Sequence, residues 1–462
     1  MNRIPPFRLS RSALGCALLM ALAACGGGGV DEEATASASA DEGRAQATAV
    51  DAAGTATALA SASLPLGTLQ LVTTRLGGAA ATASSATCAI SADGSLVLFG
   101  SDAANLVAGD TNGTADLFIK NLHTGVVARV TTQSNGAQLA GGGNCLAAGM
   151  TPDGRVVAFN SGGAVFVKNL ETGVLTQASP PGGTVPQVTG FFGGAISDDG
   201  SKVVMLTLPQ QTYAGAYNFV NVIPARLMLR DLANGSLVTL ATDNGITAQG
   251  EIVSTRFAIS PDGTRVAFVS SSAGLVPGDS NGKSDVFVRD LATGGTVIAS
   301  STSSGVPAIT TVCCSASYYQ PTFVSNSRVA FGTGQPGSLG ESGLYLKDLA
   351  TGTLTLVLSN VDGGADAVLS GDGRKVAFGQ LYGSGFDRRV FVRDLSTGQQ
   401  TLVSASSSGV ASNGQSTGAV ISRDGTRVAF GSNARNLVTP RPPANVFQIY
   451  AKVVGTAAVA QQ

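Results

Sequence analysis

The chain has 462 residues, with 28 Lys and Arg against 29 Asp and Glu, one histidine and no tryptophan. Charged residues are 12% and hydrophobic residues 44% of the sequence, which excludes a chain disordered by composition and disfavours nucleic acid as a partner. A single histidine excludes most histidine-built zinc sites, and a Ser-His-Asp triad would depend on His123. The length allows two or three ordinary domains or one large repeat domain.

Residues 1–24 have the pattern of a bacterial lipoprotein signal peptide. Three arginines among the first eleven residues precede an uncharged apolar run over 13–24. This run is shorter than the roughly 20 residues needed to span a bilayer. It ends in Leu-Ala-Ala-Cys25, which resembles the bacterial lipobox, and the resemblance implies a lipid on Cys25. The alternative is an ordinary signal peptide with an incidental cysteine.

Residues 25–66 are predicted to be the lipidated cysteine and a flexible tether, because Gly, Ala, Ser and Thr dominate without a sustained apolar period. The tether would hold a folded part away from a membrane surface. The expected location is the bacterial cell envelope, with a lipid anchor in the membrane. Gly26 stands where some bacteria place an inner-membrane retention Asp, which favours the outer membrane facing the periplasm.

Residues 67–455 contain one unit repeated seven times, followed by a short tail, 456–462. Each unit has a Ser/Thr-x-Asp-Gly turn before a β-rich run, and a degraded copy stands at 325–328. Asp-Gly between β-rich runs is a strong hairpin signal, because it tolerates the positive φ of a tight turn. The six intact turns begin at Ser91, Thr151, Ser197, Ser260, Ser370 and Ser422.

A second turn, of the Asp-Leu-Ala-Thr-Gly type, recurs in six units, so that each unit has four strands, a to d. Four-stranded units in tandem predict an all-β, seven-bladed β-propeller. The last unit lacks its second hairpin, and residues 67–79 match the strand d segment 125–137. We therefore predict that 69–74 complete the last blade beside 446–450, which removes the free edges of an unclosed ring.

The units SPDGTRVAF and DVFVRDLATG resemble the WD-repeat-like propeller repeats of TolB and its relatives. The resemblance covers Gly67 to about Gly455. It is specific for the fold and weak for the function.

Two b–c loops carry alternating Asp and Asn around a Gly turn, a pattern that suits a hard cation such as Ca²⁺. The alternative is a structural Asn-Gly turn, in which the last Asp of each loop only marks the start of the next strand. The candidate ligands are Asp110, Asn112 and Asp116 in unit 1, and Asp279, Asn281 and Asp285 in unit 4.

Four cysteines follow the lipid site, and this number of cysteines is compatible with disulfide formation in an oxidising compartment. Cys88 and Cys145 both enter strand a of adjacent units and could meet between blades. Cys313 and Cys314 could form a vicinal bond, and four free or partly buried thiols are also possible, because connectivity does not follow from sequence.

Enzyme motifs find no support in their surroundings. Residues 414–418 match G-x-S-x-G without a strand-turn-helix context, and 332–337 match a dinucleotide motif without a helix. No catalytic residue is predicted.

Aromatic residues gather in two loops, where they suit a peptide or a sugar, or pack the loops themselves. We expect a lipid-anchored binding or scaffold module for protein, peptide or glycan, which uses the long b–c and d–a loops. The alternative is a hydrolase or lyase with two facing carboxylates in the channel. The aromatic candidates are Tyr213, Tyr217, Phe219, Tyr318 and Tyr319.

Overall fold

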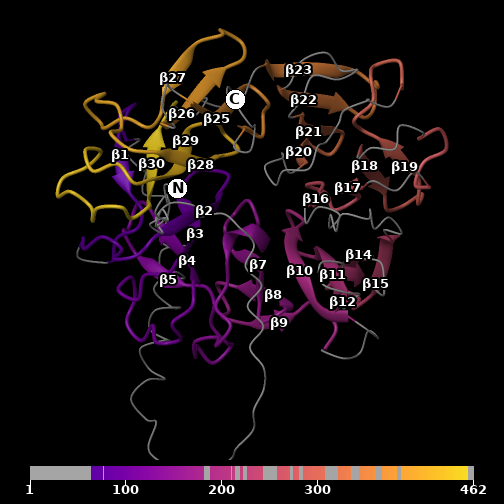
Figure 1. Cartoon of the computed structure of the whole chain (residues 1–462), viewed down its shortest axis with the longest axis horizontal. Helices are drawn as coiled ribbons and strands as arrows, with labels where there is room; N and C mark the ends of the chain where they lie inside the picture. Colours follow the sequence, from indigo (N-terminus) through magenta and orange to yellow (C-terminus); the bar gives the residue numbers. More distant parts are fainter. Residues whose placement is uncertain are drawn as a thin grey trace, which may run out of the picture. The chain divides into compact units, whose positions relative to one another are not determined.

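The computed structural model describes residues 64–75, 78–181, 188–209, 211–213, 219–221, 226–242, 257–270, 274–279, 285–306, 321–333, 343–359, 367–381 and 387–455. These residues form seven four-stranded antiparallel sheets, which confirms the predicted all-β, seven-bladed propeller (Figure 1). None of the helical structure within these ranges is long and apolar enough to cross a membrane. The signal peptide, Cys25 and residues up to 63 lie outside the described part.

The first four blades follow the chain order a, b, c, d, as their strand bounds show. Blade 1 contains β2 (Ser85–Ile90), β3 (Leu96–Ser101), β4 (Asp116–Asn121) and β5 (Val127–Arg129). Blade 2 contains a 3-10 turn, η1 (Cys145–Ala147), then β6 (Ala148–Met150), β7 (Val156–Ser161), β8 (Ala164–Asn169) and β9 (Leu175–Gln177). Blade 3 contains β10 (Val188–Ile196), β11 (Lys202–Pro209), β14 (Arg226–Asp231) and β15 (Leu237–Thr242). Blade 4 contains β16 (Phe257–Ile259), β17 (Arg265–Ser270), β18 (Asp285–Asp290) and β19 (Thr296–Ile298).

The last three blades have the same order, except that the final strand of blade 7 comes from the start of the domain. Blade 5 contains β20 (Thr322–Ser325), β21 (Arg328–Thr333), β22 (Gly343–Asp348) and β23 (Leu354–Ser359). Blade 6 contains β24 (Val368–Leu369), β25 (Lys375–Leu381), β26 (Arg388–Asp394) and β27 (Gln400–Leu402). Blade 7 contains β28 (Ser416–Ile421), β29 (Arg427–Ser432), β30 (Gln448–Val453) and β1 (Leu69–Leu71).

The repeated Ser/Thr-x-Asp-Gly sequence forms the a–b turn through side-chain hydrogen bonds. In blade 1 the Ser91 hydroxyl donates to Asp93 Oδ1 at 2.6 Å and accepts from the Leu96 N–H at 2.9 Å. Gly94 has φ 71°, a conformation that costs glycine little. The same hydroxyl-to-carboxylate bond recurs in the five other intact copies, so the motif fixes each a–b turn locally.

Adjacent blades share the apolar core. Phe99 and Phe118 on neighbouring strands of blade 1 stack with ring centroids 5.6 Å apart, and similar stacks occur in blades 4 to 7. Around this pair, one buried cluster also includes Val72 and Ile449 from blade 7. The hydrophobic side chains therefore hold each blade to the next as well as filling the blade itself.

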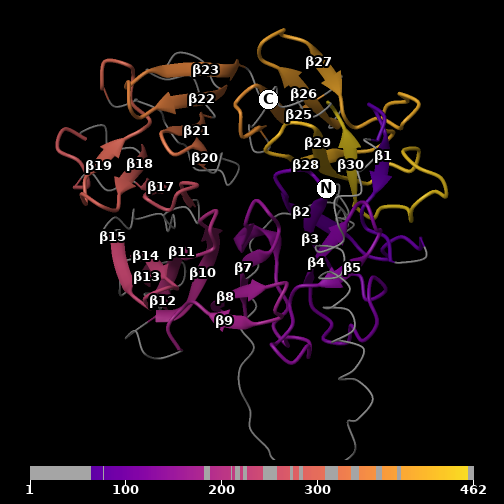
Figure 2. The same ribbon diagram turned by 180° about the vertical axis from the view of Figure 1, so that it is seen from behind.

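Strand β1 closes the ring by pairing antiparallel with β30, as predicted, and both views place the two strands side by side (Figure 2). Leu69 pairs with Lys452 and Leu71 with Tyr450. Two predicted boundaries were wrong. Strand c of blade 7 is Gln448–Val453 rather than 446–450, and β1 ends at Leu71. The segment turns away soon afterwards, because Thr74 forms a bridge with Ala80 inside its own loop.

Buried lysines on strand c bind the end of the preceding blade. Lys120 Nζ of blade 1 donates to the Thr74 carbonyl at 2.9 Å, and Lys168 of blade 2 donates to the Thr132 carbonyl at 3.1 Å. Lysines of blades 5 and 7 make the equivalent contacts. Burial lowers the pKa of Lys120 and of Lys168 to about 8. Each buried ammonium group donates hydrogen bonds to backbone carbonyls instead of to water. These bonds link adjacent blades.

Candidate functional site

A cavity of about 380 Å³ lies where the strands a of the seven blades converge. Its described lining comes from all seven blades, from Cys88 in blade 1 to Val420 in blade 7. Thr322 carries the one hydroxyl among the described lining residues, and none of them is Asp, Glu, Lys, Arg or His. The remaining lining side chains are apolar or sulfur-containing, or absent in glycine. The described side chains of this wall offer hydrophobic contact and no charged group, and the backbone at its glycines adds polar groups.

Glycines bring the strands a of blades 2 and 3 into close contact on one side of this cavity. A Cβ atom on Gly149 would lie 2.4 Å from the Gly194 carbonyl oxygen, and one on Gly194 would lie 2.5 Å from the Ala147 carbonyl oxygen. Side chains at these positions would force the two strands apart. Glycine is therefore required here by packing, and the cavity wall on this side is bare backbone.

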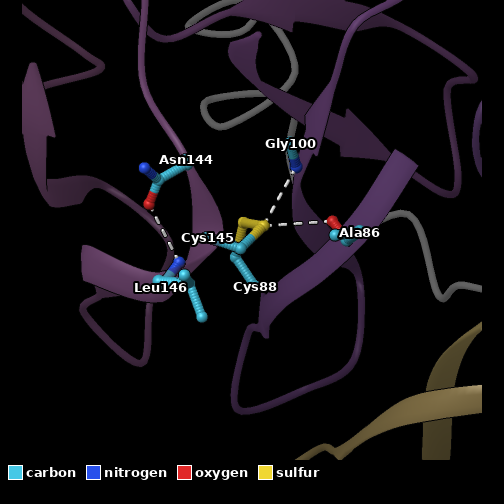
Figure 3. Close-up of a disulfide and its surroundings, with 6 residues drawn as sticks. All are labelled: Ala86, Cys88, Gly100, Asn144, Cys145 and Leu146. Atoms are coloured by element: carbon cyan, nitrogen blue, oxygen red, sulfur yellow. Dashed lines mark hydrogen bonds between the residues drawn. A yellow bond between two sulfur atoms is a disulfide. The ribbon is translucent and has the colours of Figure 1, made fainter. Parts of the chain in front are cut away.

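Cys88 and Cys145 form a disulfide in the cavity wall, with an S–S distance of 1.98 Å (Figure 3). This is the pairing between adjacent blades that the sequence analysis raised. Cys145 lies in η1, whose N-cap Asn144 accepts a hydrogen bond from the Leu146 N–H at 3.1 Å. The Gly100 N–H donates to Cys145 Sγ at 3.1 Å. The bond therefore joins blades 1 and 2 at the channel. Cys313 and Cys314 lie outside the described residues.

Hydrogen bonds link several of the a–b turns at one end of the channel. In blades 1, 3 and 6 the residue that follows Ser donates to the next blade: the Ala92 N–H to the Pro152 carbonyl at 2.7 Å, the Asp198 N–H to the Pro261 carbonyl at 3.0 Å, and the Gly371 N–H to the Arg423 carbonyl at 2.9 Å. Blade 7 connects back to blade 1, because the Asp424 N–H donates to the Ala92 carbonyl at 3.2 Å. We call these seven turns the turn ring.

One ion pair crosses the turn ring. Arg423 of blade 7 donates from Nη1 and Nη2 to the two carboxylate oxygens of Asp198 in blade 3, at 2.6 and 3.0 Å. Blades 7 and 3 are not neighbours, so this contact must run across the inside of the ring. A Cβ on Gly371 would lie 1.9 Å from Arg423 Cγ, so glycine leaves the path of this side chain open. This pair was not predicted from the sequence. The sequence does carry an indication of it: the second residue of the Ser/Thr-x-Asp-Gly turn is charged only in units 3 and 7.

The b–c loop of blade 1 brings Asp110, Asn112 and Asp116 together. Gln138 Nε2 donates to Asp110 at 2.9 Å and to Asp116 at 2.7 Å, and Asn112 Nδ2 donates to Asp116 at 3.3 Å. Arg129 Nη1 lies 3.7 Å from Asp110 and 4.0 Å from Asp116. Burial and the nearby Asp110 raise the pKa of Asp116, while hydrogen bonds oppose the rise. In this blade a guanidinium takes the position beside both carboxylates that a bound cation would need.

The b–c loop of blade 4 differs at that position. Ile298 lies opposite Phe287 in the same register that sets Arg129 opposite Phe118, so no arginine comes from this strand. Asp285 accepts from the Ser300 hydroxyl at 2.6 Å, and Asp279 Oδ1 is buried without a hydrogen-bond partner. Asn281 lies outside the described residues. Across the described part of the chain, no three His, Cys, Asp or Glu side chains are arranged to hold a metal.

Two aromatic candidates of blade 3, Tyr213 and Phe219, lie on paired strands where a loop was predicted. Strands β12 (Gln211–Tyr213) and β13 (Phe219–Asn221) pair antiparallel, with Tyr213 opposite Phe219. Tyr217, Tyr318 and Tyr319 lie outside the described residues. His123 is exposed in a c–d turn.

No protein-family model and no curated protein matches this chain. Among solved structures, it is similar to oligogalacturonate lyase from Vibrio parahaemolyticus, at 13% identity and a TM-score of 0.53 over 84% of this chain and 97% of that one. It is also similar to a puromycin-hydrolyzing peptidase from Mycobacterium tuberculosis, at 16% identity and a TM-score of 0.49 over 86% and 55%. TolB from Acinetobacter baumannii matches at 16% identity and a TM-score of 0.34 over 63% and 59%. Likeness at these identities shows a propeller fold alone.

Proposed function

We propose that the chain is a binding module of the bacterial cell envelope, which a lipid on Cys25 holds at the membrane and which binds a protein or peptide at its channel. The observation that carries the proposal is the chemistry of the cavity wall. Its described side chains supply apolar contact and no acid, base or cation. The apolar side chains of a protein or peptide partner can pack against these groups.

The cavity lining includes an exposed apolar side chain, a feature typical of binding surfaces. Leu146 lines the cavity and is 78% exposed, the largest exposed fraction among the large hydrophobic side chains of the described residues. Burial of this leucine by a partner would contribute about 1.5–3 kcal/mol. The alternative, a carboxylate-based hydrolase or lyase, has no facing pair among the described lining residues.

Site-specific photocrosslinking in intact cells tests this proposal. A benzophenone side chain would replace Leu146 in one variant and Val410, which is 56% exposed and outside the cavity lining, in a matched control. We expect one envelope protein to crosslink at 146 and to be absent at 410. The same products at both positions, or no product at 146, would contradict binding at the channel.

A further inference from the structure

We propose that blade 4 binds one calcium ion through the carboxylates of Asp279 and Asp285, and that blade 1 does not. This inference is independent of the proposed binding at the channel. It rests on a comparison of blade 4 with blades 1 and 7, whose b–c loops have related sequences. The three blades carry different groups at the same positions, so that each is a control for the others.

Blade 1 shows how the fold neutralises two carboxylates at this place. Asp110 and Asp116 both accept a hydrogen bond from Gln138 Nε2, so the two carboxylates point toward one donor. Arg129 Nη1 lies 3.7 Å from Asp110 and 4.0 Å from Asp116. The three charged side chains are all at least nine-tenths buried. The guanidinium therefore supplies the positive charge that two buried carboxylates require.

Blade 7 lacks both the arginine and the carboxylates. Leu71 occupies the register position of Arg129. Gln448 occupies that of Asp116, and its neutral side chain accepts a hydrogen bond from the Thr73 hydroxyl at 2.6 Å. The b–c loop of this blade, residues 433–447, contains no Asp or Glu. Without the guanidinium, blade 7 has no carboxylate to neutralise.

Blade 4 retains both carboxylates in the arrangement of blade 1. Asp285 occupies the register position of Asp116, and the Ser300 hydroxyl donates to it at 2.6 Å. Asp279 precedes Asp285 by six residues, the spacing that separates the two carboxylates of blade 1. The glycine before it has φ 91°, and the matching glycine of blade 1 has φ 68°. The chain therefore directs Asp279 toward the same place.

The two neutralising groups of blade 1 are both replaced in blade 4. Ile298 stands at the register position of Arg129. In the sequence, Pro307 stands two residues after a glycine, as Gln138 does in blade 1, and proline has no side-chain donor. Asp279 is only 8% exposed, and its Oδ1 has no hydrogen-bond partner. A buried carboxylate oxygen thus points to a place where blade 1 has a guanidinium.

The chemistry of this place suits calcium. A buried carboxylate is unfavourable unless a positive charge compensates it, and here the charge can come from an ion in solution. Calcium binds six to eight oxygens and accepts carbonyls and water beside carboxylates, so that two carboxylates can anchor it. Two carboxylates correspond to modest affinity, with a Kd on the order of 10⁻⁴ M, as in extracellular calcium modules.

Calorimetric titration of calcium chloride into the full mature chain, after removal of metal with a chelator, tests the site. We expect one ion per chain. Asp279→Asn preserves the size of the side chain and removes its charge, so it should weaken calcium binding at least about tenfold. The control is Asp110→Asn, which changes the matching carboxylate of blade 1 and should leave the affinity unchanged. Unchanged circular dichroism checks the fold of both variants.

A second pair of variants tests whether a guanidinium and the ion compete for one place. Ile298→Arg supplies blade 4 with the arginine of blade 1, and it should weaken calcium binding at least about tenfold. Val297→Arg adds the same charge at the adjacent residue, which is 52% exposed and whose side chain points to the opposite face of the strand. It should retain the affinity of the wild type within about twofold.

Three results would overturn the proposal. These are no calcium binding by the wild type, equal affinity of Asp279→Asn and Asp110→Asn, and equal affinity of Ile298→Arg and Val297→Arg. None of them bears on the crosslinking experiment, because Leu146 lies in the cavity lining and the calcium site lies in a b–c loop.

Discussion

Removal of β1 should destabilise the entire propeller, although only one short strand is lost. Leu69 and Val72 are buried, and burial of each such side chain contributes about 1.5–3 kcal/mol. The segment also exchanges backbone hydrogen bonds with blade 7, including Gly67 N–H to Val453 at 2.9 Å and Val72 N–H to Ile449 at 2.8 Å. Each contributes about 0.5–1.5 kcal/mol. The total loss is on the order of 5–10 kcal/mol, comparable with the stability of a whole domain.

The assay is urea unfolding of the mature chain with and without residues 67–75, followed by circular dichroism. A matched pair of point variants separates strand loss from a general effect of truncation. Val72→Asp places a carboxylate at a fully buried position, whereas Leu66→Asp changes a side chain that is 69% exposed. We expect Val72→Asp to lower the urea midpoint strongly and Leu66→Asp to leave it unchanged. Equal midpoints for these two variants would refute closure by β1 as a stabilising contact.

Three further predictions concern the address, the buried lysines and the acidic loops. Cys25→Ala should leave the protein unprocessed or soluble in cell fractionation, and unchanged membrane partitioning would contradict the lipid anchor. An unfolded lysine titrates near pH 10.4, so between about pH 8 and that value the unfolded chain binds more protons than the folded one at Lys120 and Lys168. The free energy of unfolding from urea titrations should therefore rise with pH in this window, and Lys120→Met/Lys168→Met should flatten the rise. The calcium hypothesis predicts that a chelator lowers the melting temperature of the wild type. Asp279→Ala should abolish this response and Asp110→Ala should not, because Arg129 already neutralises the blade 1 loop; identical responses in all three proteins would remove the hypothesis.

Much of the fold could be predicted because its determinants are local. A serine hydroxyl, an aspartate carboxylate and a glycine with positive φ complete each a–b turn within a few residues, as Ser91, Asp93 and Gly94 show. The closing strand could be predicted because the last unit lacks its c–d hairpin and the segment 67–79, which precedes the first unit, matches a strand d. Its exact bounds could not, because the register of β1 depends on contacts with β30 at the far end of the chain.

The candidate site was harder to predict, because it is assembled from residues distant in sequence. Cys88 stands at the bulge of β2, between Thr87 and Ala89, and Cys145 stands in a 3-10 turn. Their approach depends on both irregularities, which regular strand patterns do not indicate. The cavity wall likewise takes a few residues from each blade, and none of them carries a motif. Asp198 and Arg423 lie 225 residues apart, and only the ring geometry brings them together.

The closure of the ring also sets the order in which the chain can fold. The Thr73 hydroxyl bonds Gln448 Oε1 at 2.6 Å, across 375 residues of sequence. Six blades can each form from consecutive strands, but the seventh needs both ends of the domain, so its completion carries the largest loop-closure entropy. Until then β30 presents an unpaired edge, and β1 lacks a partner. At high concentration the edge of one copy can accept β1 of another, so that exchange between molecules competes with closure within one.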